Sequence, residues 1–294
     1  MARSKPGSIV ALVTPMDEHG KIDFPALERL VNLHLESGTD AIVVAGTTGE
    51  SATLFGEEII QVLSAVVEQV AGRMPVVAGT GGASTARAIE HTRTAARFGA
   101  DAALVVTPYY NRPMQSGLLA HYNALADTAE LPLVIYNVPS RTGVDILPET
   151  VAKLAPRDEI IAIKEAVGDM DRIQALLDLC GDSLAVLSGD DPTCLAAMNR
   201  GAKGVVSVAA NLVPQQLSEM CRQVVSNTWQ AAHEIDDTLR HLYGILSLET
   251  NPKPVKWALH RMARCGPGIR LPLLPLNKKH HEKIEQGLLQ LGLI

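Results

Sequence analysis

The stretch IIAIKE, residues 160–165, places a lysine at the end of a continuous run of apolar residues. Runs of consecutive apolar residues, in contrast to alternating ones, are typical of parallel strands that are covered on both faces. Seven further runs of this kind lie along the chain at 8–15, 41–46, 75–80, 102–108, 133–137, 184–189 and 204–210. Their spacing of about 28 residues predicts repeated strand–helix units.

The segments between these runs have the pattern of amphipathic helices. Asp23 can cap the first helix, Pro25 lies in its opening turn, and Gly38 follows its end. Further helical patterns begin near Glu57 and cover 84–98, 116–129, 171–180 and 191–199. Eight such units predict a (β/α)8 TIM barrel. An open doubly wound sheet is the alternative, but no GxGxxG motif follows an early strand to favour it.

The strand pattern stops near residue 227. Residues 228–294 have helical patterns that are interrupted by NPKP at 251–254 and by GPGIRLPLLPL at 266–276. The sequence therefore predicts two regions, a barrel over 1–227 and a C-terminal helical appendage over 228–294.

Composition excludes several classes of protein. The 294 residues carry a net charge of −6, so no basic surplus is available to neutralise nucleic-acid phosphates. The N-terminal stretch 1–16 contains no apolar core of a signal peptide, and no apolar stretch is long enough to cross a bilayer. The four cysteines are scattered, and no histidine spacing is typical of a metal site. We expect a soluble cytoplasmic protein with reduced thiols and no metal.

In a barrel of this kind, the chemistry lies at the carboxyl ends of the strands. Lys164 ends the sixth apolar run, where burial disfavours the ammonium form and leaves the neutral amine that Schiff-base formation requires. The alternative is a lysine that reaches the barrel rim or pairs with Glu165.

Tyr136 ends the neighbouring run, and adjacent strands lie about 4.8 Å apart. Its phenol could therefore exchange protons with the Lys164 amine, although a core tyrosine is the alternative. Thr47 and Thr48 could hold a small carboxylate, or could cap a glycine-rich turn. Arg141 could bind a second carboxylate through two parallel hydrogen bonds, or could be a solvated loop residue.

Six motifs together resemble one family over essentially the whole chain. They are GTTGES (46–51), TPYYNRP (107–113), YNVPSRTG (136–143), IKEA (163–166), GVVSVAAN (204–211) and NPKPVKWAL (251–259). In order and spacing they resemble the dihydrodipicolinate synthases. The wider family of pyruvate-dependent barrels also includes N-acetylneuraminate lyase and keto-sugar-acid aldolases.

The resemblance implies a lyase that condenses pyruvate with L-aspartate 4-semialdehyde, on the lysine and diaminopimelate pathway, without a cofactor. Lys164 would form the Schiff base, and Tyr136 would donate and accept protons with Thr47 and Tyr110 as a hydroxyl relay. Thr48 and Val206 would hold pyruvate, Gly189 would leave room at the floor of the site, and Arg141 would bind the carboxylate of the semialdehyde. The residue matching Tyr110 reaches a neighbouring subunit's site, so a homodimer or homotetramer is implied.

Two alternatives remain within this resemblance. Neuraminate and sugar-acid lyases generally lack an arginine at the position of Arg141, so a sibling aldolase is disfavoured by that residue. A catalytically silent barrel would need Lys164 or Tyr136 to be missing, and both are present.

The chain departs from the family pattern at the site where lysine-inhibited members bind lysine. Ser51, Ala52 and Tyr109 match that site. Its two histidines, its asparagine and its glutamate are replaced by Gly56, Ile59, Ala83 and Arg87. These replacements predict an enzyme that lysine does not inhibit.

Overall fold

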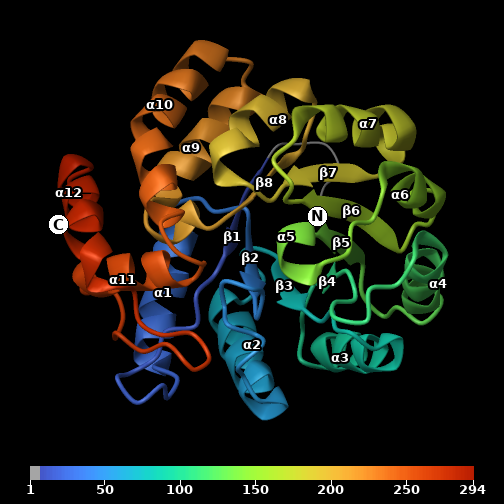
Figure 1. Ribbon diagram of the computed structural model, residues 1–294, viewed down its shortest axis with the longest axis horizontal. Helices are drawn as coiled ribbons and strands as arrows, with labels where there is room; N and C mark the ends of the chain where they lie inside the picture. Colours follow the sequence, from blue (N-terminus) through green and yellow to red (C-terminus); the bar gives the residue numbers. More distant parts are fainter. Residues whose placement is uncertain (1–6) are drawn as a thin grey trace. The chain divides into compact units, whose positions relative to one another are not determined.

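Eight parallel strands pair in sequence order, β1 to β8, and close into a barrel (Figure 1). The computed structural model describes residues 7–294, so the start of the stretch 1–16, where no signal peptide is expected, lies outside the described residues. The strands are β1 (Gly7–Ala11), β2 (Ala41–Val44), β3 (Val76–Gly79), β4 (Ala102–Val106), β5 (Leu133–Asn137), β6 (Ile160–Glu165), β7 (Ala185–Ser188) and β8 (Gly204–Ser207). Each of them lies within its predicted apolar run or starts one residue before it. The predicted barrel is confirmed.

One compact unit of the chain consists of Gly7 and Pro75–Val206, which includes β3 to β7. Its helices are α3 (Thr85–Arg97), α4 (Gln115–Ala126), α5 (Pro139–Thr142), α6 (Pro148–Leu154), α7 (Met170–Cys180) and α8 (Cys194–Arg200), with 3₁₀ turns at Gly181–Ser183 and Asp191–Thr193. Successive helices pack on one another, α3 on α4, α4 on α6, α6 on α7 and α7 on α8. The sequence patterns did not predict α5 and α6, which together follow β5.

The second compact unit consists of Ser8–Met74 and Ser207–Ile294. Its helices are α1 (Phe24–Glu36), α2 (Gly56–Val70), α9 (Pro214–Val225), α10 (Trp229–Leu246), α11 (Lys253–Arg261) and α12 (His281–Gln290), with 3₁₀ turns at Ala209–Asn211 and Lys278–His280. Helix α9 packs on α1 and α10, and α12 packs on α10 and α11. The C-terminal helices are thus confirmed, whereas a boundary at 227 stays a prediction.

The predicted helix signals have the expected local geometry. The Asp23 side chain accepts a hydrogen bond from the Ala26 N–H at 3.0 Å, and Pro25 lies in the first turn of α1. At the start of α2, the Glu58 carboxylate accepts from the Phe55 N–H at 2.9 Å. Both contacts satisfy backbone donors that a helix leaves unpaired at its N-terminus.

The described residues contain neither a helix suited to a membrane nor a disulfide. None of the helices within 7–294 is both long enough and apolar enough to cross a membrane. The four cysteines, all within this range, are buried and form no disulfide.

Candidate active site

Lys164 and Tyr136 face each other on adjacent strands. They are direct register partners of β6 and β5. The Lys164 Nζ lies 4.2 Å from the centroid of the Tyr136 ring, and the two residues are 6% and 7% exposed. The amine therefore contacts the face of an aromatic ring at the carboxyl end of the barrel strands, in a place that is almost closed to solvent.

Glu165, the next residue on β6, points the other way because successive side chains of a strand alternate. In the described part of the chain its ion pair is with Arg172 of α7, at 2.7 Å from Nε to Oε2, and not with Lys164. The alternative of a Lys164–Glu165 pair is therefore wrong. Burial raises the pKa of the Glu165 carboxyl, and the nearby Arg172 charge opposes this rise.

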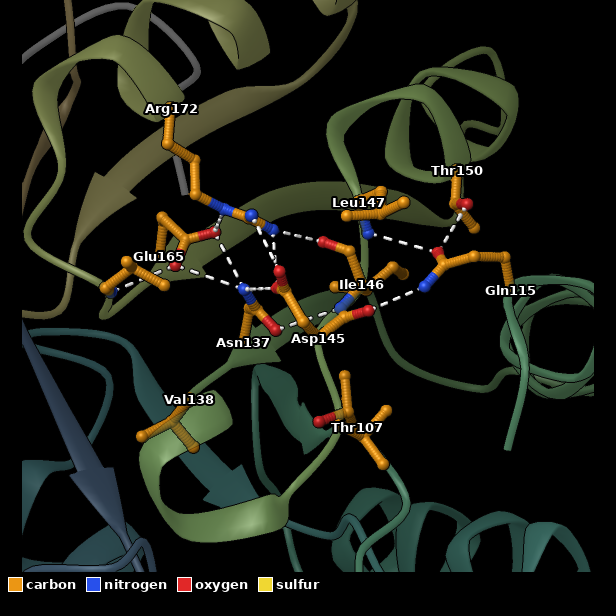
Figure 2. Close-up of polar contacts among 12 residues, drawn as sticks. Thr107, Gln115, Asn137, Val138, Asp145, Ile146, Leu147, Thr150, Glu165 and Arg172 are labelled. Carbon is orange, nitrogen blue, oxygen red and sulfur yellow. Dashed lines mark hydrogen bonds and ion pairs between the residues drawn. The ribbon is translucent and has the colours of Figure 1, made fainter. Parts of the chain in front are cut away.

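Figure 2 shows a connected set of polar side chains that includes Glu165, which we call the Arg172 network. It consists of Asn137, Asp145, Glu165 and Arg172. The Arg172 guanidinium donates to Glu165 and to both oxygens of Asp145, at 2.9 Å from Nη1 and 2.7 Å from Nη2. The Asn137 amide donates to Asp145 at 2.9 Å and to both Glu165 oxygens at 2.9 and 3.1 Å. The network thus joins the ends of β5 and β6 to the loop after β5.

Gly189, which follows β7, is tightly packed against the Lys164 side chain. A Cβ added at this position would lie 2.8 Å from the Lys164 Cε and 2.8 Å from the Ala166 Cβ. Real Cβ atoms do not approach other carbons so closely, so glycine is needed where the lysine passes. The space that Gly189 leaves is therefore space for the stem of Lys164.

Arg141 and Val206 lie in the same compact unit as Lys164. Arg141 is exposed on the short helix α5, and its backbone N–H donates to the Val138 carbonyl at 2.9 Å. Val206 is buried on β8. Roles for these two residues in holding substrate stay predictions.

Thr47 and Thr48 belong to the other compact unit, in the loop that follows β2. Ala45 and Glu50, on either side of them, have left-handed backbone conformations with φ of 52° and 57°. Such conformations cost free energy in residues other than glycine and cluster at functional loops. Thr48 is buried, and its hydroxyl accepts a hydrogen bond from the Asn251 amide at 2.9 Å. The tail of the chain thus contacts the proposed pyruvate loop.

Tyr110 is 93% exposed, and among the other proposed residues only Arg141 is exposed as well. The Tyr110 backbone φ of 72° is in the left-handed region, which is unusual for a bulky side chain. The Tyr110 side chain is therefore open to solvent in this chain, and its backbone adopts a conformation that costs free energy.

Sequence reasoning missed the charged residues that support these loops. The missed residues form buried or half-buried ion pairs across long stretches of sequence. Arg172 pairs with Asp145, 27 residues away, and with Glu165, 7 residues away. Lys256 pairs with Glu50, 206 residues away. A signal was present for Lys256, since it follows Val255 and precedes Trp257 and Ala258 in an otherwise apolar segment. Among residues 7–294, no group of three or more His, Cys, Asp or Glu side chains is arranged to hold a metal ion.

Comparison with known proteins points to one family. The family model described as "Dihydrodipicolinate synthetase family" matches residues 4–291. The 4-hydroxy-tetrahydrodipicolinate synthase of Ectopseudomonas mendocina is 51% identical over 98% of this chain and 99% of its own length. The enzyme of the same name from Acidithiobacillus ferrooxidans is 52% identical over 96% of this chain and 97% of its own.

A solved structure agrees with these relatives. The crystal structure of the chloride-inhibited dihydrodipicolinate synthase from Acinetobacter baumannii, complexed with pyruvate, superposes with a TM-score of 0.97. The two sequences are 47% identical, and the match covers 99% of this chain and 100% of that one.

Proposed function

The chain belongs to the dihydrodipicolinate synthetase family, and we propose from this membership and from its site that it condenses pyruvate with L-aspartate 4-semialdehyde. The product is 4-hydroxy-tetrahydrodipicolinate, and the reaction belongs to lysine biosynthesis. The observation that carries the proposal is the buried Lys164 amine at the end of β6, in contact with the Tyr136 ring.

The Lys164 amine is the nucleophile in this proposal. Its lone pair adds to the pyruvate ketone carbon, and the resulting carbinolamine loses water to give the imine. Loss of a proton from the methyl carbon gives an enamine, and that carbon attacks the aldehyde carbon of the second substrate. The amino group of the bound semialdehyde then attacks the imine carbon, which closes the ring and releases the Lys164 amine.

The other residues bind substrates and move protons. Tyr136 accepts and returns the protons that imine formation and breakdown require, with the Thr47 and Tyr110 hydroxyls as relay groups. Thr48 and Val206 hold pyruvate. Arg141 binds the carboxylate of the semialdehyde, because a guanidinium matches the two oxygens of a carboxylate.

We propose further that the enzyme is a homodimer or a homotetramer. The exposure of Tyr110 supports a role in which its side chain reaches the site of a neighbouring subunit. Tyr109 and Met114, which lie near it in the sequence, are exposed as well. Exposed aromatic side chains in a group favour a protein interface. A cytoplasmic location is part of the proposal, since four thiols without a disulfide are typical of a reducing compartment.

Reduction with borohydride in the presence of pyruvate tests the chemistry. We expect mass spectrometry to find a stable pyruvate adduct on Lys164, and none in Lys164→Ala. An adduct on Lys256, which among residues 7–294 is the other buried lysine, would contradict the assignment. The second substrate is tested with a panel of aspartate semialdehyde, N-acetylmannosamine and glyceraldehyde. Preference for either of the latter two would show a sibling aldolase.

A further inference from the structure

The loop that carries Arg141 begins and ends at the Arg172 network. It leaves β5 after Asn137, forms α5, and returns at Asp145 and Ile146 (Figure 2). Asn137 holds both ends together, since its side-chain oxygen accepts from the Ile146 N–H at 3.2 Å and its amide donates to Asp145 at 2.9 Å. Asn137, where the loop begins, is therefore hydrogen-bonded to Asp145 and Ile146, where the loop ends.

Arg172 joins this closed loop to the strand that carries Lys164. Its Nη1 and Nη2 donate to the two Asp145 oxygens, and its Nε donates to Glu165. The Nη2 group also contacts the Ile146 carbonyl oxygen. A pair of parallel charge-assisted hydrogen bonds fixes direction as well as distance. The Arg172 side chain is only 11% exposed and the Glu165 side chain is fully buried, so water competes weakly for their ion pair, whereas the Asp145 side chain is 38% exposed.

A second anchor comes from helix α4. The Gln115 amide donates to the Asp145 carbonyl at 2.6 Å, and its oxygen accepts from the Leu147 N–H at 3.1 Å and the Thr150 hydroxyl at 2.7 Å. Figure 2 shows these contacts on the side of Asp145 away from Glu165. Asp145 is thus held through its side chain and through its backbone.

We infer that Asp145 and Arg172 are positioning residues for the second substrate, because they fix the loop on which Arg141 stands. The inference rests on the proposed function, in which Arg141 binds the semialdehyde carboxylate. A misplacement of about 1 Å at a substrate-orienting group is enough to cost a large factor in rate or affinity. If Asp145 and Arg172 only supported the barrel in general, their substitution would change the KM values of both substrates and the stability of the protein together.

Steady-state kinetics of Asp145→Asn separate these two roles. Asparagine keeps the shape of the side chain but replaces one acceptor by a donor, which breaks the parallel pair with Arg172. We expect KM for aspartate semialdehyde to rise about tenfold, with KM for pyruvate and the borohydride-trapped adduct at Lys164 within about twofold of wild type. Arg172→Lys keeps the charge but loses the planar fork, and it should have the same selective effect. It also tests the inference if Asp145→Asn fails to fold.

A double-mutant cycle with Arg141→Ala shows whether Asp145 acts through Arg141. If it does, Asp145→Asn adds no further rise in KM in the Arg141→Ala background, because coupled residues are not additive. The matched control is Asp127→Asn, which breaks the surface ion pair of Asp127 with Arg157 at 2.7 Å in the same compact unit. This control should leave both KM values unchanged.

The possible failures are distinguishable. If wild type does not turn over the semialdehyde, or Arg141→Ala leaves its KM unchanged, the proposed function or the role of Arg141 is wrong. If Arg141→Ala raises that KM and Asp145→Asn and Arg172→Lys do not, the positioning inference alone is overturned. Additive effects, or equal rises in both KM values, would also overturn it.

Discussion

Gly189 shows how a residue without a side chain can control the position of Lys164, the proposed Schiff-base lysine. An alanine Cβ there would overlap the Lys164 Cε and the Ala166 Cβ, each 2.8 Å away, and Ala166 has no rotamer by which to yield. The Lys164 stem must therefore move, and with it the amine that contacts Tyr136. If the end of β7 shifted instead to accommodate the alanine, the surroundings of the Lys164 amine would also be disturbed.

We predict that Gly189→Ala slows formation of the pyruvate imine by at least about fivefold, since overpacking of this kind costs about 1–3 kcal/mol. The rate of borohydride-trapped adduct formation measures it. The control is Gly244→Ala on the exposed face of α10, where an added Cβ meets nothing within 4 Å. That control should keep full activity and gain about 0.5–1 kcal/mol in stability. An unchanged trapping rate in Gly189→Ala would refute the steric role.

Single residues could be predicted where the signal was local. Lys164 and Tyr136 end apolar runs on adjacent strands, and that pattern alone placed them together. The partner of Glu165 could not be predicted in this way. Arg172 lies on the following helix, and no periodicity of the sequence says that its side chain turns back toward β6 and Asp145.

Among the elements, the strands were predictable, whereas no helical pattern was assigned to α5, α6 or α9. Each barrel strand is buried on both faces, so its apolar run is continuous and easy to detect. Helices α5 and α6 have only four and seven residues. Helix α5 is too short to show helical periodicity. Helix α6 is as long as the predicted α8, and its buried Val151 and Leu154, three residues apart, were a signal that the sequence analysis missed. The connection after β5 therefore had no predicted helix, although it carries Arg141.

The C-terminal helix α11 supports the loop after β2 through buried polar contacts. Lys256 of α11 and Glu50 form an ion pair and are 3% and 1% exposed. The Arg270 N–H donates to the other Glu50 oxygen at 3.2 Å, and Asn251 donates to Thr48. The tail is therefore an integral support of the Thr47–Thr48 loop, which the sequence-based division at 227 does not convey.

We predict that Lys256→Met destabilises the protein by about 3–5 kcal/mol, because it leaves the Glu50 carboxylate buried without its counter-charge. The double variant Glu50→Gln with Lys256→Met should be more stable than Lys256→Met alone, since no buried charge remains. Urea unfolding measures both. Lys253→Met on the same helix is the control, because its pair with Glu249 is more exposed and should cost less. A single variant within about 1 kcal/mol of wild type would contradict the prediction.

At the scale of the whole molecule, the exposed Tyr110 predicts a site completed by a second copy of the chain. Hybrids of Tyr110→Phe and Lys164→Ala chains, purified by two different tags, should regain activity. One of their two sites would combine an intact Lys164 with an intact Tyr110 from the other chain. Hybrids of Tyr136→Phe and Lys164→Ala are the control, because these two residues lie on adjacent strands of one chain and no site can be repaired. Equal activity of the two hybrids would argue against a shared site.

At the site where the family resemblance places bound lysine, this chain departs from the family pattern. The family resemblance places a glutamate of the lysine-binding site at the position of Arg87, which is exposed in the first turn of α3. An acidic side chain there would attract an ammonium group of lysine, whereas an arginine repels it. The positions of the two histidines are occupied by Gly56 and Ile59, and that of the asparagine by Ala83, so the polar contacts are replaced as well.

We therefore predict that millimolar L-lysine does not inhibit the enzyme. A lost hydrogen bond to a charged group is worth about 1.5–3 kcal/mol. Charge repulsion adds to this loss, although solvent and salt screen it at an exposed residue. Together they should weaken lysine binding roughly a hundredfold. Steady-state assays with and without lysine measure the effect, and Arg87→Glu tests its cause, since this variant should bind lysine more tightly than wild type. Clear partial inhibition of the wild-type enzyme would mean that lysine binds through a different set of residues.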